Sequence, residues 1–469
     1  MPPWGLADSA RLRPVAGLRE AYARGDSSGA TMEGRASPTR GAILRASERP
    51  MSMTKYTKLE RNWVMYDVGN SALVLLNTSI VPIYFNAINT GASAAELVSA
   101  WANAQTVASL VVALLMPVLG SLADYAGNKI KFFIGFFLTG LVLCFAQAIP
   151  MGALPFLVAY VVCTIGLNSS MTFYDAMLTD VTTDERMDMV SSSGYAWGYV
   201  GSTIPFIVCL ALIFGGPALL GLDTMLCTRL SFVITGAWWL AFTVPLIRTY
   251  RQRFGKERGE GETLGKICAN TFSGLAKTMR SIAKDRTLIV YMLAFFFYID
   301  GVHTVISMAT SYGAALGIDS TQLVLALLVT QFVAFPSAIA YGKLAGRFGT
   351  LRMIIAAVVA YCGIVLFAAF ALKTATEFWI LAILVGLFQG GIQALSRSYF
   401  GKLVPKERSN EYYGFFDIFG RYASVMGTFL VSVITAATGS ANLGVLSIGI
   451  LLVVGLVLLL TLPDARSRA

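Results

Sequence analysis

The stretch GSLADYAG, residues 120–127, decides the fold, because a related stretch, GKLAGRFG, returns at residues 342–349. The second begins 222 residues after the first, and the same offset brings DER at 184–186 onto KER at 406–408. Separate landmarks that share one offset indicate an internal repeat. The chain is therefore predicted to contain two related halves.

The composition places these halves in a membrane. The chain has 469 residues, 56% hydrophobic and 13% charged, against about 25% charged in an ordinary soluble domain. Apolar runs of about 20 residues, each long enough to cross a hydrocarbon core of about 30 Å as a helix, recur after the first sixty residues. We expect an all-α membrane protein with twelve transmembrane helices in two six-helix parallel repeats. The expected spans are 63–88, 97–122, 131–149, 153–178, 194–213, 230–248, 288–312, 319–341, 352–371, 377–398, 415–437 and 441–462.

The basic residues predict the orientation. They gather in the connections that follow even-numbered spans, and the other connections are nearly bare, with Lys373 the main exception. Because basic loops stay on the cytoplasmic side, both termini are predicted to be cytoplasmic, in a bacterial cytoplasmic membrane. The net charge of +10 is then a property of membrane loops, and no nucleic-acid partner is expected.

The chain divides into four regions. Residues 1–58 are rich in Arg, Gly, Pro and Ser without an apolar run, which predicts a disordered tail or an extension from a wrongly assigned start codon. The N-terminal six-helix half occupies 59–248 and the C-terminal half 288–469. The linker at 249–287 contains LGKICANTFSGLAKTMRSIAKDR (264–286), whose apolar residues keep helical spacing opposite lysines and arginines. This pattern predicts an amphipathic helix on the inner membrane surface.

The string GSLADYAGNK resembles the loop signature of the major facilitator superfamily between spans two and three. The matching positions are Gly120, Asp124, Gly127 and Lys129. The strings YDVGNSA (66–72), FYDAMLTDV (173–181), GYAWGYVGS (194–202), YIDGVHTV (298–305) and QALSRSYFGKLVP (393–405) look like its vacuole-effluxer-like branch, over about residues 60–462. The resemblance implies a facilitator fold in which the first and seventh spans line a central cavity. It also implies amino-acid efflux, the activity of the named vacuolar member of autophagy.

The stretch FFFYIDGVHTVISM, residues 295–308, carries the residues expected to bind a proton or solute. Asp300 lies about 18 Å into its span, near the bilayer midplane, where a carboxylate costs about 2.5–3.5 kcal/mol. With His303, Thr304 and Ser307 it forms one polar stripe, which favours a water-filled cavity. A desolvated carboxylate beside an imidazole can load and release a proton near neutral pH. The alternative is a buried structural pair that fixes helix contacts.

Polar residues in other spans extend the expected solute site, and charged residues near the cytoplasmic ends predict a gate. The further site residues are Asn70, Asn77, Asn168, Gln389 and Gln393. The gate residues are Asp67, Asp124, Asp175, Arg397, Asp417 and Arg421. The repeat offset gives Asp175 and Arg397 matching positions with opposite charge, so they are predicted to pair across the halves. The alternatives are snorkelling, pairing within a helix and, for Asp67, capping of a helix start.

These features predict a secondary transporter of a small polar solute that works by alternating access, coupled to protons, with amino-acid efflux as one candidate. No Walker string, GxSxG elbow or HExxH motif indicates an enzyme. A single histidine and scattered cysteines indicate no metal site, and no cofactor is expected. A non-transporting membrane sensor or scaffold, and a transporter of sugars or drugs, stay open as alternatives. The expected partners are the lipid bilayer, a small-molecule substrate and protons, and we expect a monomer.

Overall fold

The computed structural model describes residues 56–257, 275–315, 317–422 and 425–463. The predicted N-terminal extension lies outside this part of the chain, apart from its last residues, and the residues from Tyr56 onward form one unit. Within the described ranges the unit is built of helices, and its one β-type contact is an isolated bridge between Tyr125 and Lys256. The all-α prediction is confirmed.

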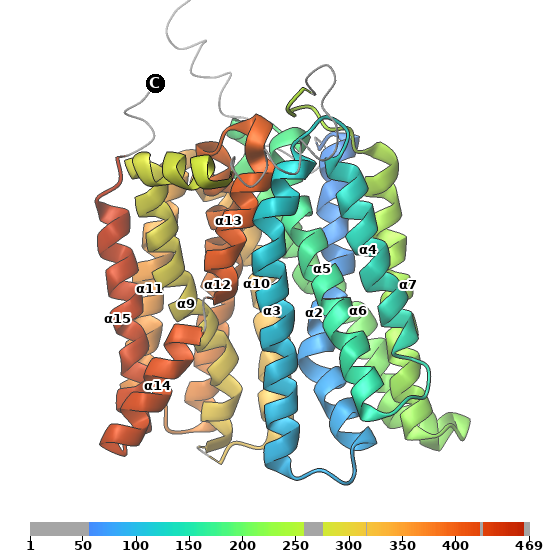
Figure 1. Ribbon diagram of the computed structural model, residues 1–469. Coiled ribbons are helices and arrows are strands. Elements are labelled where there is room, and N and C mark those ends of the chain that lie inside the picture. Colours follow the sequence, from blue (N-terminus) through green and yellow to red (C-terminus); the bar gives the residue numbers. More distant parts are fainter. Residues whose placement is uncertain (1–55, 258–274, 316, 423–424, 464–469) are drawn as a thin grey trace, which may run out of the picture. The chain divides into compact units, whose positions relative to one another are not determined.

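Thirteen labelled α-helices account for the twelve expected spans in the described ranges (Figure 1). The N-terminal half holds α2 (Lys58–Ile88), α3 (Ala94–Ala123), α4 (Lys129–Ala146), α5 (Ala153–Val181), α6 (Asp184–Leu220) and α7 (Thr224–Thr249). The C-terminal half holds α9 (Arg286–Ala315), α10 (Ser320–Phe348), α11 (Thr350–Phe370), α12 (Ala375–Leu403), the short η2 (Lys406–Arg408), α13 (Ser409–Tyr422), α14 (Val425–Thr438) and α15 (Ala441–Leu460).

Eleven helices of the described ranges are long and apolar enough to cross a membrane. The span expected at 415–437 is covered by α13 and α14, which flank residues 423–424 outside the described ranges. Its second part, residues 426–438, is a shorter apolar helix. The polar first part, α13, carries the charges that meet the other half.

Local sequence signals explain where several helices begin and end. Thr57 and Glu60 form a capping box at the start of α2, and Ser93 and Glu96 form another at the start of α3. In each box the hydroxyl accepts a backbone N–H of the first turn while the glutamate accepts that of the cap. Helix α6 ends at Gly221, whose φ of 64° lies in the left-handed region that glycine adopts freely.

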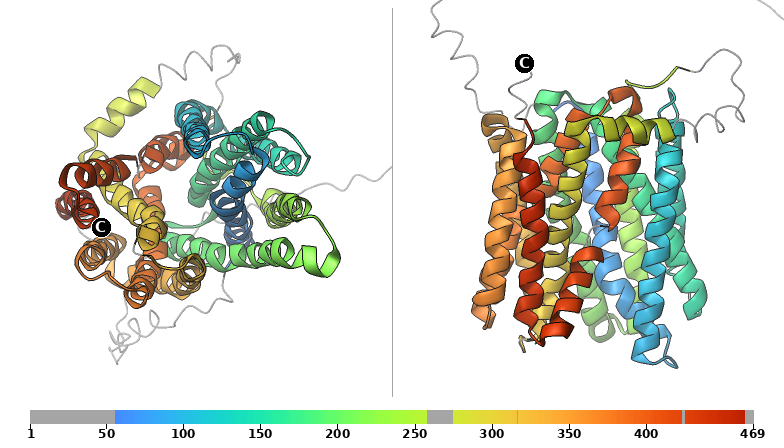
Figure 2. Two further views of the ribbon diagram at one scale, coloured as in Figure 1. Left: turned by 90° about the horizontal axis from the view of Figure 1, so that it is seen from below. Right: turned by 60° about the vertical axis from the view of Figure 1, so that its left-hand side comes forward.

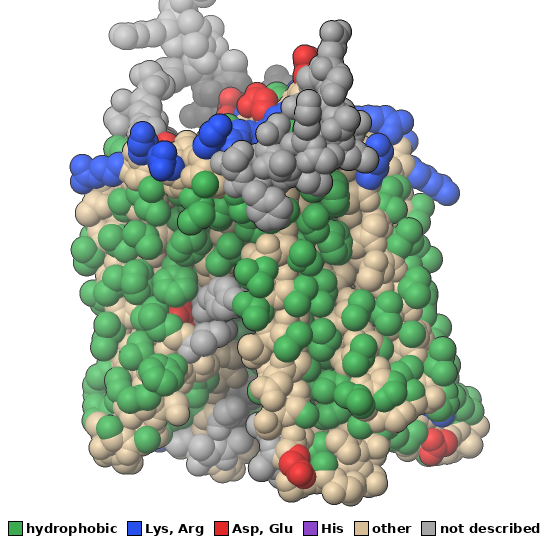
Figure 3. Space-filling model, in the orientation of Figure 1, with side chains coloured by type: hydrophobic (Ala, Val, Ile, Leu, Met, Phe, Trp, Pro, Cys, Tyr) green, Lys and Arg blue, Asp and Glu red, His purple; other side chains and the backbone are tan. Residues whose placement is uncertain are grey.

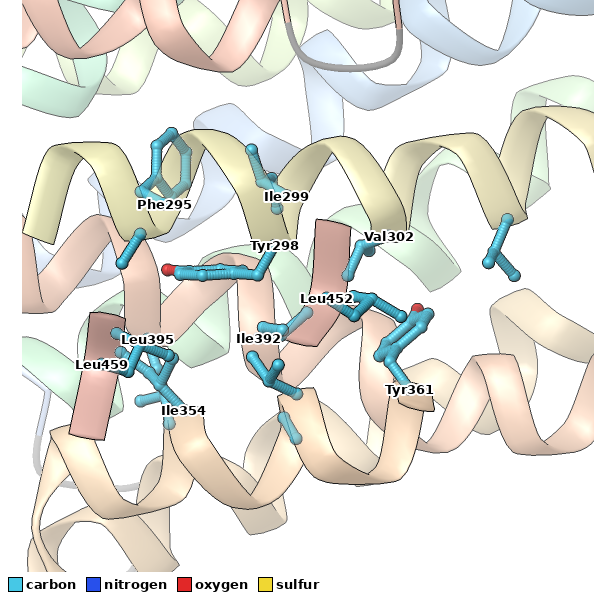
Figure 4. Packing of buried hydrophobic residues seen from close by; sticks show 14 of the residues in the cluster. Phe295, Tyr298, Ile299, Val302, Ile354, Tyr361, Ile392, Leu395, Leu452 and Leu459 are labelled. Carbon is cyan, nitrogen blue, oxygen red and sulfur yellow. The ribbon is translucent and has the colours of Figure 1, made fainter. Parts of the chain in front are cut away.

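Each half has its own apolar core. In the C-terminal half, Tyr298 and Val302 of α9 point toward α11, α12 and α15 (Figure 4), whereas Phe295 stacks on Phe416 of α13. The N-terminal core is a separate cluster that includes Trp63 and Trp239. The halves meet along two helix pairs, α6 with α10 and α3 with α13, which the repeat relates to each other. The two cores are thus separate clusters on either side of this seam.

The surface has an apolar belt around the sides of the helices and a basic region at one end of the bundle. Apolar side chains cover the sides of the helices, and lysines and arginines gather at one end, which we call the basic end (Figure 3). The starts of α2, α4 and α9 and the ends of α3, α7 and α12 all lie there. Below the basic end, the face in Figure 3 is hollowed between the halves.

A helix at residues 275–284, which we call the linker helix, lies crosswise to the spans at the basic end (Figures 1 and 2). It is part of the helix predicted at 264–286, of which residues 264–274 lie outside the described ranges. Its Leu275 and Ile282 pack on the C-terminal core.

Candidate solute path and charged gate

Arg397 of α12 joins the two halves at the basic end. Its Nη1 donates to Oδ1 of Asp175 at 2.9 Å and its Nη2 to Oδ2 of Asp67 at 3.3 Å. Its Nε donates to the hydroxyl of Ser191 at 2.9 Å, and Nη2 also reaches the Ser191 carbonyl at 3.0 Å. A guanidinium of the C-terminal half is thus held by α2, α5 and α6 of the N-terminal half.

Aromatic rings enclose this guanidinium. Its Cζ lies 4.5 Å from the ring centre of Tyr195, 4.7 Å from Trp63 and 5.5 Å from Tyr174. The rings exclude water and attract the cation, so the ion pairs act in a medium of low polarity. Gly194 permits the arrangement, because a Cβ there would overlap the Asp67 carboxylate and approach Nη2 of Arg397 to 3.1 Å. The predicted pairing of Asp175 with Arg397 is present, and Asp67 joins it.

Two lysines, the buried Lys129 and the partly buried Lys402, make further contacts between the halves. Lys129 of α4 bonds Asp180 at 2.6 Å in its own half and donates to the Ser409 hydroxyl of the other half at 3.0 Å. Lys402 of α12 bonds Asp188 of the other half at 2.7 Å. Lys129 matches the loop signature in the sequence, but neither lysine was among the predicted gate residues. The signal was present, since the repeat offset pairs Asp180 with Lys402 as it pairs Asp175 with Arg397, again with opposite charge.

Asp124, from the repeated loop, holds the start of α13 across the halves. Its Oδ1 accepts the Asn410 backbone N–H at 2.9 Å and the Asn410 side-chain amide at 2.8 Å, and its Oδ2 accepts the Glu411 N–H at 3.2 Å. First-turn N–H groups lack acceptors inside their own helix, so a carboxylate there stabilises it. Burial raises the pKa of Asp124 to about 6, although Lys129 and Lys256 oppose the rise.

The other predicted gate residues lie on α13. Asp417 accepts a hydrogen bond from the Thr172 hydroxyl of α5, so it too contacts the opposite half. The side chain of Arg421 lies outside the described part of the structure. The basic end is therefore closed in this structure by contacts from α2, α3, α4, α5 and α6.

Asp300 differs from the expected arrangement. Its carboxylate is fully buried, and its Oδ1 accepts the Thr304 hydroxyl at 3.2 Å and the Gly427 backbone N–H at 3.0 Å. Both Asp300 and His303 are described, and they form no hydrogen bond or ion pair with each other. Helix α14 approaches α9 closely at this point, because Gly427 has no side chain and a Cβ there would collide with Thr304.

The remaining predicted site residues are spread along the bundle. Asn70 is buried and donates to Asp67 at 3.3 Å, which places it with the gate. Asn77 is also buried, and its side-chain oxygen has no hydrogen-bond partner among the described residues. Gln389 is buried, Gln393, Asn168 and His303 are partly buried, and Ser307 is exposed. No hydrogen bond between described residues brings this last group together.

Two repeated six-helix halves, held together by buried charge pairs at one end, define a transporter of the major facilitator type. A family model described as "Vacuole effluxer Atg22 like" matches residues 178–469. The chain belongs to this family of multi-pass integral membrane proteins. The resemblance found in the sequence is thereby confirmed.

Individual relatives agree with this assignment. The chain is 43% identical over 425 residues to the "Uncharacterized MFS-type transporter YxiO" of Bacillus subtilis (strain 168), over 88% of this chain and 97% of the relative. It is 24% identical over 300 residues to "Autophagy-related protein 22-1" of Aspergillus niger (strain ATCC MYA-4892 / CBS 513.88 / FGSC A1513), covering 60% of this chain and 48% of that protein. The chain thus matches about half the length of the fungal relative.

A solved structure shows the same fold. The proton:xylose symporter XylE bound to 6-bromo-6-deoxy-D-glucose superposes with a TM-score of 0.68 at 11% identity, over 87% of this chain and 96% of that one. The similar proteins are transporters and not enzymes. The chain is accordingly a membrane transporter that contacts the lipid bilayer and a small-molecule substrate.

Proposed function

We propose that this protein is a proton-coupled secondary transporter that exports a small polar solute, amino acids first, as a monomer in a bacterial cytoplasmic membrane. The observation that carries the proposal is the Arg397 bridge. All its side-chain acceptors lie in the opposite half, so opening the basic end must break every one of them. A site closed by such contacts on one side suits alternating access, in which the halves rock about a central path.

The same bridge supports proton coupling. One guanidinium, that of Arg397, meets two carboxylates, Asp67 and Asp175, so this group of three side chains holds more negative than positive charge when both acids are ionised. The side chain of Asp175 is 22% exposed and that of Asp67 is 9% exposed. A proton from solvent therefore reaches Asp175 more easily than Asp67. Protonation removes the charge-assisted bond to Arg397 and weakens the closed end.

Asp300 is the second candidate for the coupling group. It lies on α9, and its Oδ1 already accepts the Thr304 hydroxyl and a backbone N–H from α14. We therefore rank it below Asp175. Asn77, Asn168, Gln389, Gln393, His303 and Ser307 are the proposed solute contacts, with Thr304 supporting Asp300.

The two candidates can be separated by transport assays on purified protein in liposomes. Radiolabelled amino acids, sugars and nucleosides are screened under an imposed pH gradient, and the active solute is followed in Asp175→Asn and Asp300→Asn. The coupling variant should lose gradient-driven accumulation and keep solute exchange, which needs no net proton movement. Asp223→Asn, at an exposed helix cap of α7, is the matched control. Gradient-driven accumulation that survives in both variants would refute proton coupling through either residue.

A further inference from the structure

The linker helix has three faces that meet different surroundings. At 100° per residue, positions three or four apart share a face. The inward face packs on the C-terminal half, and its threonine, Thr278, is fully buried. Its residues are Leu275, Thr278 and Ile282.

The two outward faces are exposed and differ in polarity. One is apolar, with Met279 58% exposed. Its residues are Ala276, Met279 and Ala283. The other is basic, lies about 100° further round the helix, and consists of Lys277, Arg280 and Lys284, all exposed. Nothing in the described protein covers the apolar face.

The position of the helix shows what covers it. The linker helix runs crosswise at the periphery of the bundle, just before α9 enters the apolar belt (Figures 1 and 2). An apolar face beside a basic face, at the level where spans begin, matches the boundary between acyl chains and headgroups. We propose that the linker helix binds anionic phospholipid headgroups of the leaflet at the basic end and thereby stabilises the closed gate.

The inward face connects the helix to the gate. The Thr278 hydroxyl donates to Oε1 of Glu411 at 2.5 Å, and Arg408 bonds both residues. Lys256 also donates to Glu411, at 3.2 Å. Glu411 lies in the first turn of α13, the turn that Asp124 holds from the other half. Separating α13 from Asp124 therefore displaces the linker helix, and a lipid surface that retains the helix opposes this displacement.

The inference has two parts that can fail separately. Lipid contact rests only on the faces and position of the helix. The effect on the gate also rests on the alternating access proposed above. The experiment therefore measures lipid contact and gate closure independently of transport.

The test uses the full chain in lipid nanodiscs of phosphatidylcholine alone or mixed with phosphatidylglycerol. A fluorophore at Met279→Cys reports contact with brominated lipid chains. A spin-label pair at Glu185→Cys and Glu407→Cys, exposed and equivalent by the repeat, reports the width of the basic end. The test variant is Lys277→Gln/Arg280→Gln/Lys284→Gln. The control, Arg61→Gln/Lys131→Gln/Lys343→Gln, removes the same charge from exposed positions elsewhere at the basic end.

We expect quenching at position 279 and a closed-to-open ratio that rises with phosphatidylglycerol. The rise should reach about fivefold for each engaged charge, so about 100-fold for three is the upper limit. The test variant should lose this rise and the control should keep it. An unquenched label overturns the lipid site. A ratio insensitive to phosphatidylglycerol, or lost equally in both triple variants, overturns its coupling to the gate. If quenching persists in a protein that transports nothing, the lipid site stands and the proposed function falls.

Discussion

Gly194→Ala is expected to open the basic end without altering any charged residue. The added Cβ would overlap the Asp67 carboxylate, which is the free end of a side chain and can rotate away. Rotation breaks the bond from Nη2 of Arg397, now 3.3 Å long. A hydrogen bond to a charged group contributes about 1.5–3 kcal/mol. The closed-to-open ratio should therefore fall by about 10- to 150-fold.

The change can be measured as a distance distribution across the basic end, with spin labels at Glu185→Cys and Glu407→Cys. The described native cysteines of the N-terminal half are buried and should label slowly. Gly215→Ala, on the same helix, is the matched control, because its Cβ would meet only Leu219 at an ordinary 3.5 Å. A wild-type distribution in Gly194→Ala would refute the view that the Arg397 bridge keeps this end closed.

Three further outcomes follow from buried contacts. Burial raises the pKa of Asp124 from 3.8 to about 6, so its protonated form stabilises the fold below about pH 4, and this contribution is lost as the pH rises through about 6. Thermal unfolding of Asp124→Asn should therefore show a smaller loss of stability over that range than the wild type. An equal loss of stability in the variant would contradict the raised pKa of Asp124. Lys129→Met should cost about 3–5 kcal/mol by leaving Asp180 buried without this ion pair, although Tyr250 still donates to its carboxylate. The loss should appear as a lower unfolding temperature, whereas Lys131→Met at an exposed position should change little. Gly427→Ala should force α14 away from α9 and lower the unfolding temperature, while Gly363→Ala, with open space around it, should not. Equal unfolding temperatures in the two variants would refute the view that Gly427 is needed for close packing of α14 on α9.

Much of the fold could be predicted from the sequence because it depends on local composition. Apolar runs of span length and the 222-residue repeat are properties of the chain itself, and they predict the helices and the two halves. The polar start of α13 at Ser409 could not be read this way, because the apolar run that predicts the span begins only at residue 415.

The gate was partly predictable and the midplane site was not. The repeat offset matched Asp175 with Arg397, since equivalent positions face each other across the pseudo-twofold axis. The surroundings of Asp300 depend on which helix packs against α9. Sequence proximity suggested the imidazole of His303 as partner, but the Asp300 carboxylate accepts the Thr304 hydroxyl and a backbone N–H from residue 427, which tertiary packing brings near. Docking of Thr278 on Glu411 depends on tertiary packing in the same way.

The opposite charges at Asp175 and Arg397 have a consequence for assembly. Because the two positions are equivalent and touch, two copies of the N-terminal half paired in this geometry would bring aspartate against aspartate, and two C-terminal halves would bring arginine against arginine. Like charges buried at such a seam repel and lack compensation. An ancestral duplicated unit could therefore pair with itself only before these charges diverged. Their divergence makes each half recognise the other and reject its own kind, so that halves expressed as separate polypeptides should associate as a heterodimer.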